Sequence, residues 1–271
     1  MRIEVSDLTF QYPNGVQALG GVSLSIQPGE KVAIVGQNGA GKTTLAKHFN
    51  GLLKPSSGKV MAGDWDTREH SVAKLSHRVG YVFQNPDDQL FSRTVEKEVA
   101  VGPKNLGYSL EKIEKLVEDS LSLTELGPHR EANPYDLSPT WRKMVALASV
   151  IAMDTPVVIF DEPTTGQDAT SIQRISQIVD TLAAKGKTLI TITHDIDFAA
   201  EHFDRLIAMG QGIILLDGPV LDVISQEEIL ASTYVDPPQL TRLGTQLGLP
   251  QTVRTPSEFL RVYRTWLEQR G

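Results

Sequence analysis

The segment from Gly36 to Thr43 reads GQNGAGKT and fits the pattern G-x-x-x-x-G-K-[ST]. Its three glycines allow the backbone to curl so that successive N–H groups face one point. An apolar run at 31–35 precedes the segment and a helical stretch at 44–50 follows it, so the positive end of a helix aims at the same point. This strand–loop–helix setting predicts a phosphate-binding loop, with Lys42 on the outer phosphates and the Thr43 hydroxyl on Mg²⁺.

Two acids end a second apolar run. Val157 to Phe160 is continuously apolar, as expected for a central parallel strand, and Asp161 and Glu162 follow it directly. Burying two carboxylates at the end of such a strand costs free energy, so the pair indicates a function. Beside a phosphate-binding loop, we expect Asp161 to hold Mg²⁺ through its water shell and Glu162 to polarise the water that attacks the terminal phosphate.

His194 and Gln84 each follow a further predicted strand. His194 comes after the β-branched run 188–193, and Gln84 after the run 79–83. A lone histidine at a strand end is more often structural, but ligands of open α/β sheets bind at the carboxyl ends of the strands. We therefore expect His194 to sense the terminal phosphate, and Gln84 to ligate Mg²⁺ or to hydrogen-bond the attacking water.

These segments imply a split α/β core that positions the site residues. Its two halves, 1–85 and 155–225, flank a mainly helical insertion near 90–150. The predicted fold is a mostly parallel sheet with an antiparallel β subdomain, a helical subdomain and a small C-terminal helical extension. We place the nucleotide-binding domain at 1–228 and the extension at 229–271.

The last helix of the extension has a clear start. Thr255 is the predicted N-cap, Pro256 occupies the first helical position and Glu258 completes a capping box. One face of this helix is an aromatic and apolar stripe of Phe259, Val262, Tyr263 and Trp266. The stripe either packs on its own chain or forms a subunit interface, in which case the extension is a dimerisation element.

Composition narrows the class of protein. With 40% hydrophobic and 22% charged residues, the 271-residue chain has the balance of a globular protein with a real core. A net charge of −7 argues against nucleic acid and anionic lipid as direct partners, and the lack of cysteine excludes disulfides and thiolate metal sites. No apolar stretch approaches the roughly 20 residues of a membrane span, and the N-terminus MRIEVSDLTF alternates like a strand instead of forming a signal-peptide core.

The chain resembles the ATP-binding cassette (ABC) ATPases over essentially its whole length. The resemblance rests on GQNGAGKTT (36–44), Gln84, VVIFDEPTTGQD (157–168) and the Thr-His-Asp run at 193–195. Within that family it is similar to the energy-coupling factor (ECF) transporters for vitamins and metal ions. That similarity lies in YVFQNPDDQLF (81–91), TVEKEVAVGPKNLG (94–107) and PPQLTRL (237–243).

The resemblance implies a P-loop NTPase core with ATP and Mg²⁺ as cofactors. Two such subunits would sandwich two ATP molecules at the cytoplasmic face of the membrane. They would drive a transmembrane coupling subunit that works with a substrate-capturing membrane protein. The implied nucleotide-binding residues are Tyr12, which stacks on adenine, and Gly36, Gln37, Asn38, Gly39, Ala40, Gly41, Lys42, Thr43 and Thr44. The implied Mg²⁺ ligands are Thr43, Gln84 and Asp161, the catalytic residues are Glu162, His194 and Gln84, and Asp168 belongs to the loop that touches the opposite subunit.

The signature segment, which reads LSGGQ in the family, departs from the pattern. It reads LSPTW here, from Leu137 to Trp141. In the family the serine hydroxyl and the glycine amides reach the partner's γ-phosphate, but Pro139 has no N–H and Thr140 adds a side chain where the backbone must come close. Ser138 can still cap a helix, and proline is favoured at its first position. We expect the helix to be kept and its grip on phosphate to be weakened.

Two functions from different classes remain open. The first is an ATPase that energises an ECF-type importer, and the second is a largely non-hydrolysing regulatory subunit of a heterodimeric ABC complex. Glu162 and His194 favour the first, whereas the altered signature favours the second for one of two sites. Because a signature completes the partner's ATP site, a heterodimer with a paralogue fits both observations. A soluble ABC protein of DNA repair or translation fits less well, because neither a long coiled coil nor a basic surface is evident. The transported substrate would be selected by a different polypeptide.

Overall fold

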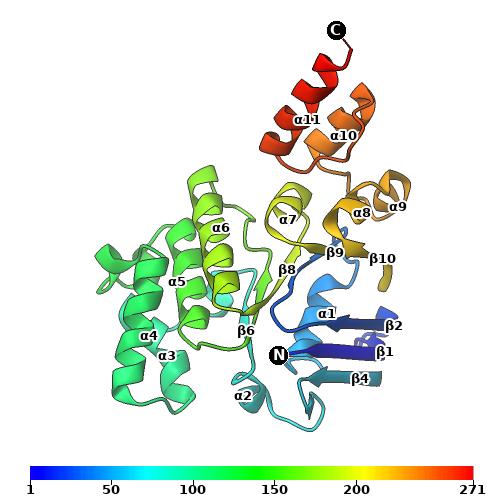
Figure 1. Cartoon of the computed structure of the whole chain (residues 1–271). Coiled ribbons are helices and arrows are strands. Elements are labelled where there is room, and N and C mark those ends of the chain that lie inside the picture. Colours follow the sequence, from blue (N-terminus) through cyan, green and yellow to red (C-terminus); the bar gives the residue numbers. More distant parts are fainter. Residues whose placement is uncertain (271) are drawn as a thin grey trace.

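The computed structural model describes residues 1–270, whose strands form two separate sheets (Figure 1). The larger sheet has the strand order β10-β9-β3-β8-β7-β6, and all neighbours are parallel except β10 and β9. Every residue of β7 and β8 is buried, which fits the apolar run at the start of β7 and the alternation of threonine with leucine and isoleucine in β8. The strands are β3 (Lys31–Val35), β6 (Val79–Val82), β7 (Val157–Asp161), β8 (Thr188–Thr193), β9 (Arg205–Gly210) and β10 (Ile213–Pro219).

The register of the central strands brings their carboxyl ends to one edge of this sheet. Val35 at the end of β3 pairs with Thr193 at the end of β8, and Asp161 at the end of β7 pairs with Ile192. Strand β6 runs parallel beside β7. The loops that follow β3, β6, β7 and β8 therefore emerge together, and these loops carry all the catalytic residues expected from the sequence.

The smaller sheet is antiparallel, as predicted. Its order is β2-β1-β4-β5, with β1 (Ile3–Gln11), β2 (Gln17–Ile26), β4 (Ser57–Ala62) and β5 (Trp65–Asp66). Helix α1 (Lys42–Phe49) follows the glycine-rich loop and buries Leu45 and Phe49 in a core shared by the two sheets. This packing fixes the axis of α1 against both sheets.

Three helices of the insertion cover the opposite side of the large sheet, away from the small sheet (Figure 1). They are α3 (Val95–Asn105), α4 (Leu110–Leu123) and α5 (Pro139–Ile151), and the short 3₁₀ turns η2 (Gly127–His129) and η3 (Pro134–Asp136) connect α4 to α5. Ser109 caps α4, whose face of Ile113, Val117 and Leu121 is buried. Helix α5 is buried continuously from its fifth residue, because it lies between the sheet and the other two helices.

The remaining helices complete the core and the tail. α2 (Val72–Leu75) and the 3₁₀ turn η1 (Pro86–Asp88) flank β6, while α6 (Ala169–Ala184), α7 (Ile196–His202), α8 (Val220–Ile224) and α9 (Glu227–Ser232) lie in the second half of the core. Leu230 and Val235 are buried with the larger core, just beyond the boundary predicted at 228. The boundary itself stays a prediction. No helix within residues 1–270 combines the length and apolarity needed to cross a bilayer.

The tail ends in a helical pair that lies at the top of Figure 1, at some distance from the small sheet. It consists of α10 (Gln239–Leu247) and α11 (Pro256–Glu268). The predicted cap is present, since the Thr255 hydroxyl accepts a hydrogen bond from the Glu258 backbone N–H at 3.2 Å. Of the predicted stripe only Val262 is fully buried, while Phe259, Tyr263 and Trp266 are half-buried and stacked on one another. Both interpretations of the stripe therefore stay open.

Candidate nucleotide site

Two glycines of the glycine-rich loop occupy positions that no other residue fits. Gly36 has φ +149°, and a Cβ atom there would lie 2.3 Å from the Met209 carbonyl oxygen. Gly41 has φ +97°, and its Cβ atom would lie 2.7 Å from the Ala18 carbonyl oxygen. The loop is therefore pressed against the backbone of β9 and β2, and this contact fixes its curl at the N-terminus of α1.

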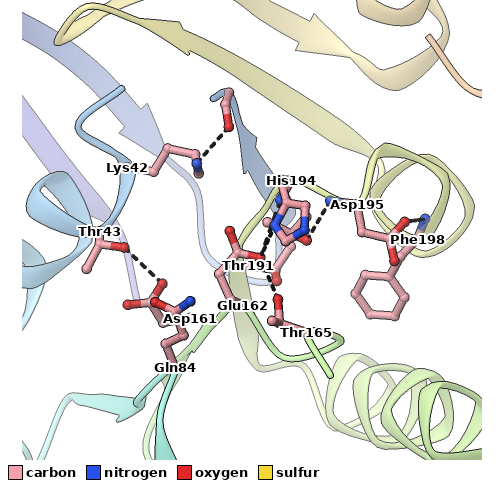
Figure 2. Close-up of polar contacts among 12 residues, drawn as sticks. Lys42, Thr43, Gln84, Asp161, Glu162, Thr165, Thr191, His194, Asp195 and Phe198 are labelled. Carbon is pink, nitrogen blue, oxygen red and sulfur yellow. Dashed lines mark hydrogen bonds and ion pairs between the residues drawn. The ribbon is translucent and has the colours of Figure 1, made fainter. Parts of the chain in front are cut away.

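Lys42 lies over the loop from which it starts. Its Nζ donates hydrogen bonds to the Gly36 carbonyl at 2.7 Å and to the Gln37 carbonyl at 3.1 Å (Figure 2). Burial lowers the pKa of the Lys42 amine, and the nearby negative charges of Glu162 and Asp161 act in the opposite direction. The amine thus stands between the loop and two carboxylates, where a point charge meets the outer phosphates of a bound nucleotide.

Asp161 is held by hydroxyl groups on both of its oxygens. Thr43 Oγ1 donates to Asp161 Oδ1 at 3.0 Å (Figure 2), and the Tyr81 hydroxyl donates to Oδ2 at 2.6 Å. Burial, and then the adjacent charge of Asp161, raises the pKa of Tyr81 and keeps its phenol protonated as a donor. The two contacts fix the carboxylate plane toward the loop.

The oxygen atoms near Thr43 suit Mg²⁺. Thr43 supplies a hydroxyl, Asp161 a carboxylate and Gln84 an amide oxygen, which are the hard donors that Mg²⁺ prefers. Within residues 1–270 no group of three or more His, Asp or Glu side chains could hold a metal ion. These few protein oxygens fit a Mg²⁺ ion whose coordination would be completed by phosphate oxygens and water.

Glu162 and His194 form a direct pair. His194 Nδ1 lies 2.8 Å from Glu162 Oε2, and the Thr165 hydroxyl donates to the same oxygen at 3.2 Å (Figure 2). The Glu162 side chain is 6% exposed and that of His194 57% exposed, so the pair spans the border between core and solvent. The prediction that the strand of His194 lies beside that of Asp161 is confirmed by their pairing in the sheet.

The backbone of Glu162 is unusual. Its φ is +47°, in the left-handed region that residues other than glycine rarely adopt. Such a conformation costs on the order of 1–3 kcal/mol and persists only where the surroundings enforce it. Here the Glu162 N–H donates to the Ile192 carbonyl at 2.8 Å, so the strand pairing holds the turn. The turn redirects the Glu162 side chain toward the glycine-rich loop.

A cavity of about 370 Å³ brings most of the predicted residues together. Tyr12 is at one end, where its hydroxyl lies 3.0 Å from Thr44 Oγ1, and its ring meets Phe10 edge to face. Gln84 is exposed and faces the cavity from the loop after β6. His194 contacts the cavity only through Glu162. Residues of the predicted site that line the cavity are Tyr12, Asn38, Gly39, Ala40, Gly41, Lys42, Thr43, Thr44, Gln84 and Glu162.

The signature segment keeps a well-formed helix start. The Ser138 hydroxyl accepts a hydrogen bond from the Trp141 N–H at 3.4 Å, and Pro139 is the first residue of α5. Asp168 does the same for α6, where it accepts from the Ser171 N–H at 2.8 Å, and this bond holds the pKa of the Asp168 carboxyl below its usual value. Both segments are helix N-termini, and Ser138, Pro139 and Asp168 are exposed.

Trp141 turns back onto its own chain. Its ring lies 4.7 Å from the His129 ring, and the Arg174 guanidinium of α6 lies 5.1 Å from the ring centroid. Arg174 also pairs with Glu125 at 2.7 Å. The bulky residue thus bridges the insertion and the core, in a segment where the family has a small polar side chain.

Two contributors to the site were not recognised from the sequence. Tyr81 holds Asp161, and Lys143 donates to the carbonyls of Phe83 and Gln84. Each had a signal. Tyr81 falls on a buried strand, where a phenol hydroxyl needs a partner. Lys143 falls on the buried face of α5, in line with Ala146 and Leu147, where an unpaired ammonium would be costly.

With this geometry established, comparison with known proteins identifies the class. The sequence model of the family described as ABC transporter matches residues 19–165, more than half of the chain. The chain belongs to the ABC transporter family of ATP-binding proteins. It is 39% identical over 245 residues to the energy-coupling factor transporter ATP-binding protein EcfA of Methanococcus maripaludis, which covers 89% of this chain and 87% of the relative. The predicted resemblance to ECF ATP-binding subunits is confirmed.

The predicted fold class is also confirmed by solved structures. The chain superposes with a TM-score of 0.76 and 34% identity on CbiO1 from Clostridium perfringens, described as part of the ABC transporter complex CbiONQ, with coverage of 91% of this chain and 98% of that one. It superposes with a TM-score of 0.74 and 28% identity on a dimeric ATP-binding cassette, MJ0796, bound to ADP and Pi, over 80% of this chain and 98% of that one.

Some relatives are much longer. The chain is 40–42% identical to putative ABC transporter ATP-binding proteins of Methanosarcina acetivorans, Caldanaerobacter subterraneus and Methanosarcina mazei. It spans only 40–43% of their length.

Proposed function

We propose that this chain is the ATP-binding and hydrolysing subunit of an ECF-type importer. The observation that carries the proposal is the pair of Glu162 and His194, 2.8 Å apart, beside a cavity that also holds Lys42 and Thr43. Its similarity to EcfA and CbiO1 supports the ECF type.

The chemistry of the proposed reaction follows from the positions of these side chains. Lys42 binds the outer phosphates, and Asp161 and Thr43, with Gln84, would hold Mg²⁺, which neutralises charge that develops on the phosphate oxygens. Glu162 accepts the proton of a water whose oxygen bonds to the γ-phosphorus, while the bond to the β,γ-bridging oxygen breaks and ADP leaves. His194 keeps Glu162 in place through its 2.8 Å contact and, with a side chain that is 57% exposed, would sense the terminal phosphate through that pair.

The proposed assembly contains four kinds of subunit. A second ABC ATPase, a paralogue with an intact signature, supplies the contacts that Pro139 and Thr140 cannot make. A transmembrane coupling subunit receives the motion, and a membrane protein captures the vitamin or metal ion. This chain would then lie peripherally on the cytoplasmic face of the membrane, held there by its protein partners. The dimer of the related MJ0796 cassette supports pairing of two ATP-binding subunits.

The alternative, a largely non-hydrolysing regulatory subunit, is less well supported. It would not require a carboxylate held by histidine in a conformation that costs free energy, as Glu162 is. The altered signature bears on the partner's ATP site, because none of residues 138–141 lines the cavity of this chain.

The test is reconstitution of the complex in lipid vesicles. The chain is co-expressed with a paralogous ATPase, a coupling subunit and a capture protein, and uptake of vitamin or metal ion is measured with ATP inside or outside. We expect uptake only with ATP on the side of the ATPases, and MgATP binding by the purified chain. A chain that binds no MgATP, or uptake that is independent of ATP, would reject the proposal.

A further inference from the structure

We propose that Lys143 is a positioning residue that fastens Gln84 to helix α5, and so links this chain's own nucleotide site to the helix that begins with the altered signature. The inference rests on the proposed function for the role of Gln84. Beyond the proposed function, it assigns a role to Lys143 and describes a route of communication between the two ATP sites of the dimer.

The contacts of Lys143 end at the base of Gln84. Its Nζ donates to the Gln84 carbonyl at 2.7 Å and to the Phe83 carbonyl at 3.2 Å. These two peptide groups directly follow β6, where the chain leaves the sheet and no strand partner is available for them. An ammonium that binds both carbonyls therefore sets the direction in which Gln84 points.

Burial makes this link strong and specific. Lys143 is 2% exposed, so its charge cannot turn to water, and removing it would leave the carbonyls of Phe83 and Gln84 without this partner. Burial lowers the pKa of the Lys143 amine to about 8, and the charges of Asp161 and Glu162 oppose the shift. The two acids of the site thus attract the amine, in opposition to the effect of burial.

Other contacts join the rest of the same loop to α5. The Gln89 amide donates to the Ala146 carbonyl and to Ser149 Oγ, both at 2.8 Å. Arg142 pairs with Asp87 at 2.8 Å. Residues 83–89 and α5 are therefore connected along about two turns of the helix, and of these contacts only those of Lys143 reach Gln84.

The consequence concerns two positions near the N-terminus of α5. Ser138 lies at the exposed N-terminus of the helix, where a signature meets the partner's nucleotide, and Lys143 lies five residues further on. Because an α-helix is stiff over this distance, a shift of its N-terminus against the partner moves the amine of Lys143 and with it the Gln84 backbone. Contact at the partner's site is thus reported to Gln84 in this chain's own site.

The experiment compares Lys143→Met with Lys143→Gln. Met keeps the length and apolar volume but cannot donate, whereas Gln is shorter and can donate one hydrogen bond. The first measurement is hydrogen–deuterium exchange of the nucleotide-free chain at the amides of Asp87, Asp88 and Gln89. We expect exchange to accelerate about tenfold or more in Lys143→Met and less in Lys143→Gln, since the charged hydrogen bonds to the carbonyls of Phe83 and Gln84 are lost.

The second measurement is binding of a fluorescent ATP analogue with Mg²⁺ and with EDTA. Mg²⁺ should raise the affinity of Lys143→Met about tenfold less than it raises that of the wild type, whereas the affinity in EDTA should be unchanged. Lys143→Gln should retain more of the Mg²⁺-dependent affinity than Lys143→Met does. The control is Lys187→Met, which removes a partly buried lysine (16% exposed) paired with Asp154 at the opposite end of the sheet and should change neither measurement.

Three outcomes would overturn the proposal. If Lys143→Met binds the Mg²⁺–nucleotide as tightly as Lys143→Gln or more tightly, Lys143 acts by packing. If exchange at residues 87–89 is unchanged, Lys143 does not hold the loop. If neither variant folds, as judged by thermal unfolding, Lys143 is a folding residue and not a positioning one. A wild-type chain that binds no Mg²⁺–nucleotide would reject the proposed function, whereas the exchange measurement without nucleotide judges Lys143 independently.

Discussion

Two helix N-termini of this chain are expected to meet phosphate, one in this chain's own cavity and the other in the site of a partner, and they are built differently. At the start of α1, Gly36 and Gly41 allow the backbone to curl, and Lys42 lies over the loop. At the start of α5, Ser138 and Pro139 form an equally regular helix start with no glycine. A serine cap and a proline suffice to begin a helix, but cradling phosphate needs N–H groups and close backbone approach. The start of α1 has both features, whereas at the start of α5 Pro139 has no N–H and Thr140 carries a side chain where the backbone would have to come close.

The largest effect expected from this comparison is at Glu162. Glu162→Gln keeps the shape of the side chain but cannot take the proton of the attacking water, so ATP hydrolysis by the complex should fall by about 10²-fold or more, with ATP binding retained. The measurement is steady-state ATPase activity together with nucleotide binding. Unchanged turnover would exclude Glu162 as the base.

The same change in the partner tests the asymmetry. If this chain's site, completed by the partner's intact signature, carries most of the hydrolysis, the matching Glu→Gln in the paralogue should cost much less. Equal losses from the two changes, or full activity of this chain alone, would show that the altered signature is a tolerated variation.

The next largest effect is expected at Lys42, which lies at the glycine-rich start of α1. Lys42→Ala removes the point charge on the outer phosphates, and a charged hydrogen bond of this kind corresponds to about a 10- to 100-fold loss in affinity. A titration with fluorescent ATP measures it. The control is Lys187→Met, which should bind as the wild type does, and a Lys42→Ala chain with wild-type affinity and turnover would contradict the assignment of the loop.

Restoring the degenerate end should have a smaller, opposite effect. A triple variant, Pro139→Gly, Thr140→Gly and Trp141→Gln, returns the backbone N–H at position 139, removes the side chain at position 140 and removes the ring packed on His129. Because single preorganised donors contribute 10²-fold or more elsewhere, we expect the ATPase activity of this chain alone to rise by about tenfold, together with dimer formation on ATP. No gain in either would show that residues 139–141 do not limit the homodimer.

The smallest effect concerns the helix and not the phosphate. Ser138→Ala removes the cap at the start of α5, which should lower the free energy of unfolding by about 1 kcal/mol. Urea denaturation measures the loss. Thr255→Ala, which removes the equivalent cap of α11, serves as a comparison far from the site and should cost a similar amount.

The sequence by itself determined the elements that depend on nearby residues. The strand of 31–35, the glycine-rich loop and the strand of 188–193 were predicted at their observed bounds, because apolar runs, glycines and caps act over a few residues. The insertion was less complete. Helix α3 was not predicted individually and contains Pro103 in its interior, and α4 ends at Leu123, two residues before Glu125, which takes a positive φ.

Only the tertiary structure decided which side chains meet. The 2.8 Å contact of His194 with Glu162 depends on the register of β7 and β8, the bond of Tyr81 to Asp161 joins residues 80 positions apart, and Lys143 reaches Gln84 across 59 positions. Trp141 could equally have faced a partner, but it packs on His129 of its own chain. Residue types and their spacing along the chain predict which groups do the chemistry, whereas their partners follow from strand register and helix packing, which join segments that local pattern cannot relate.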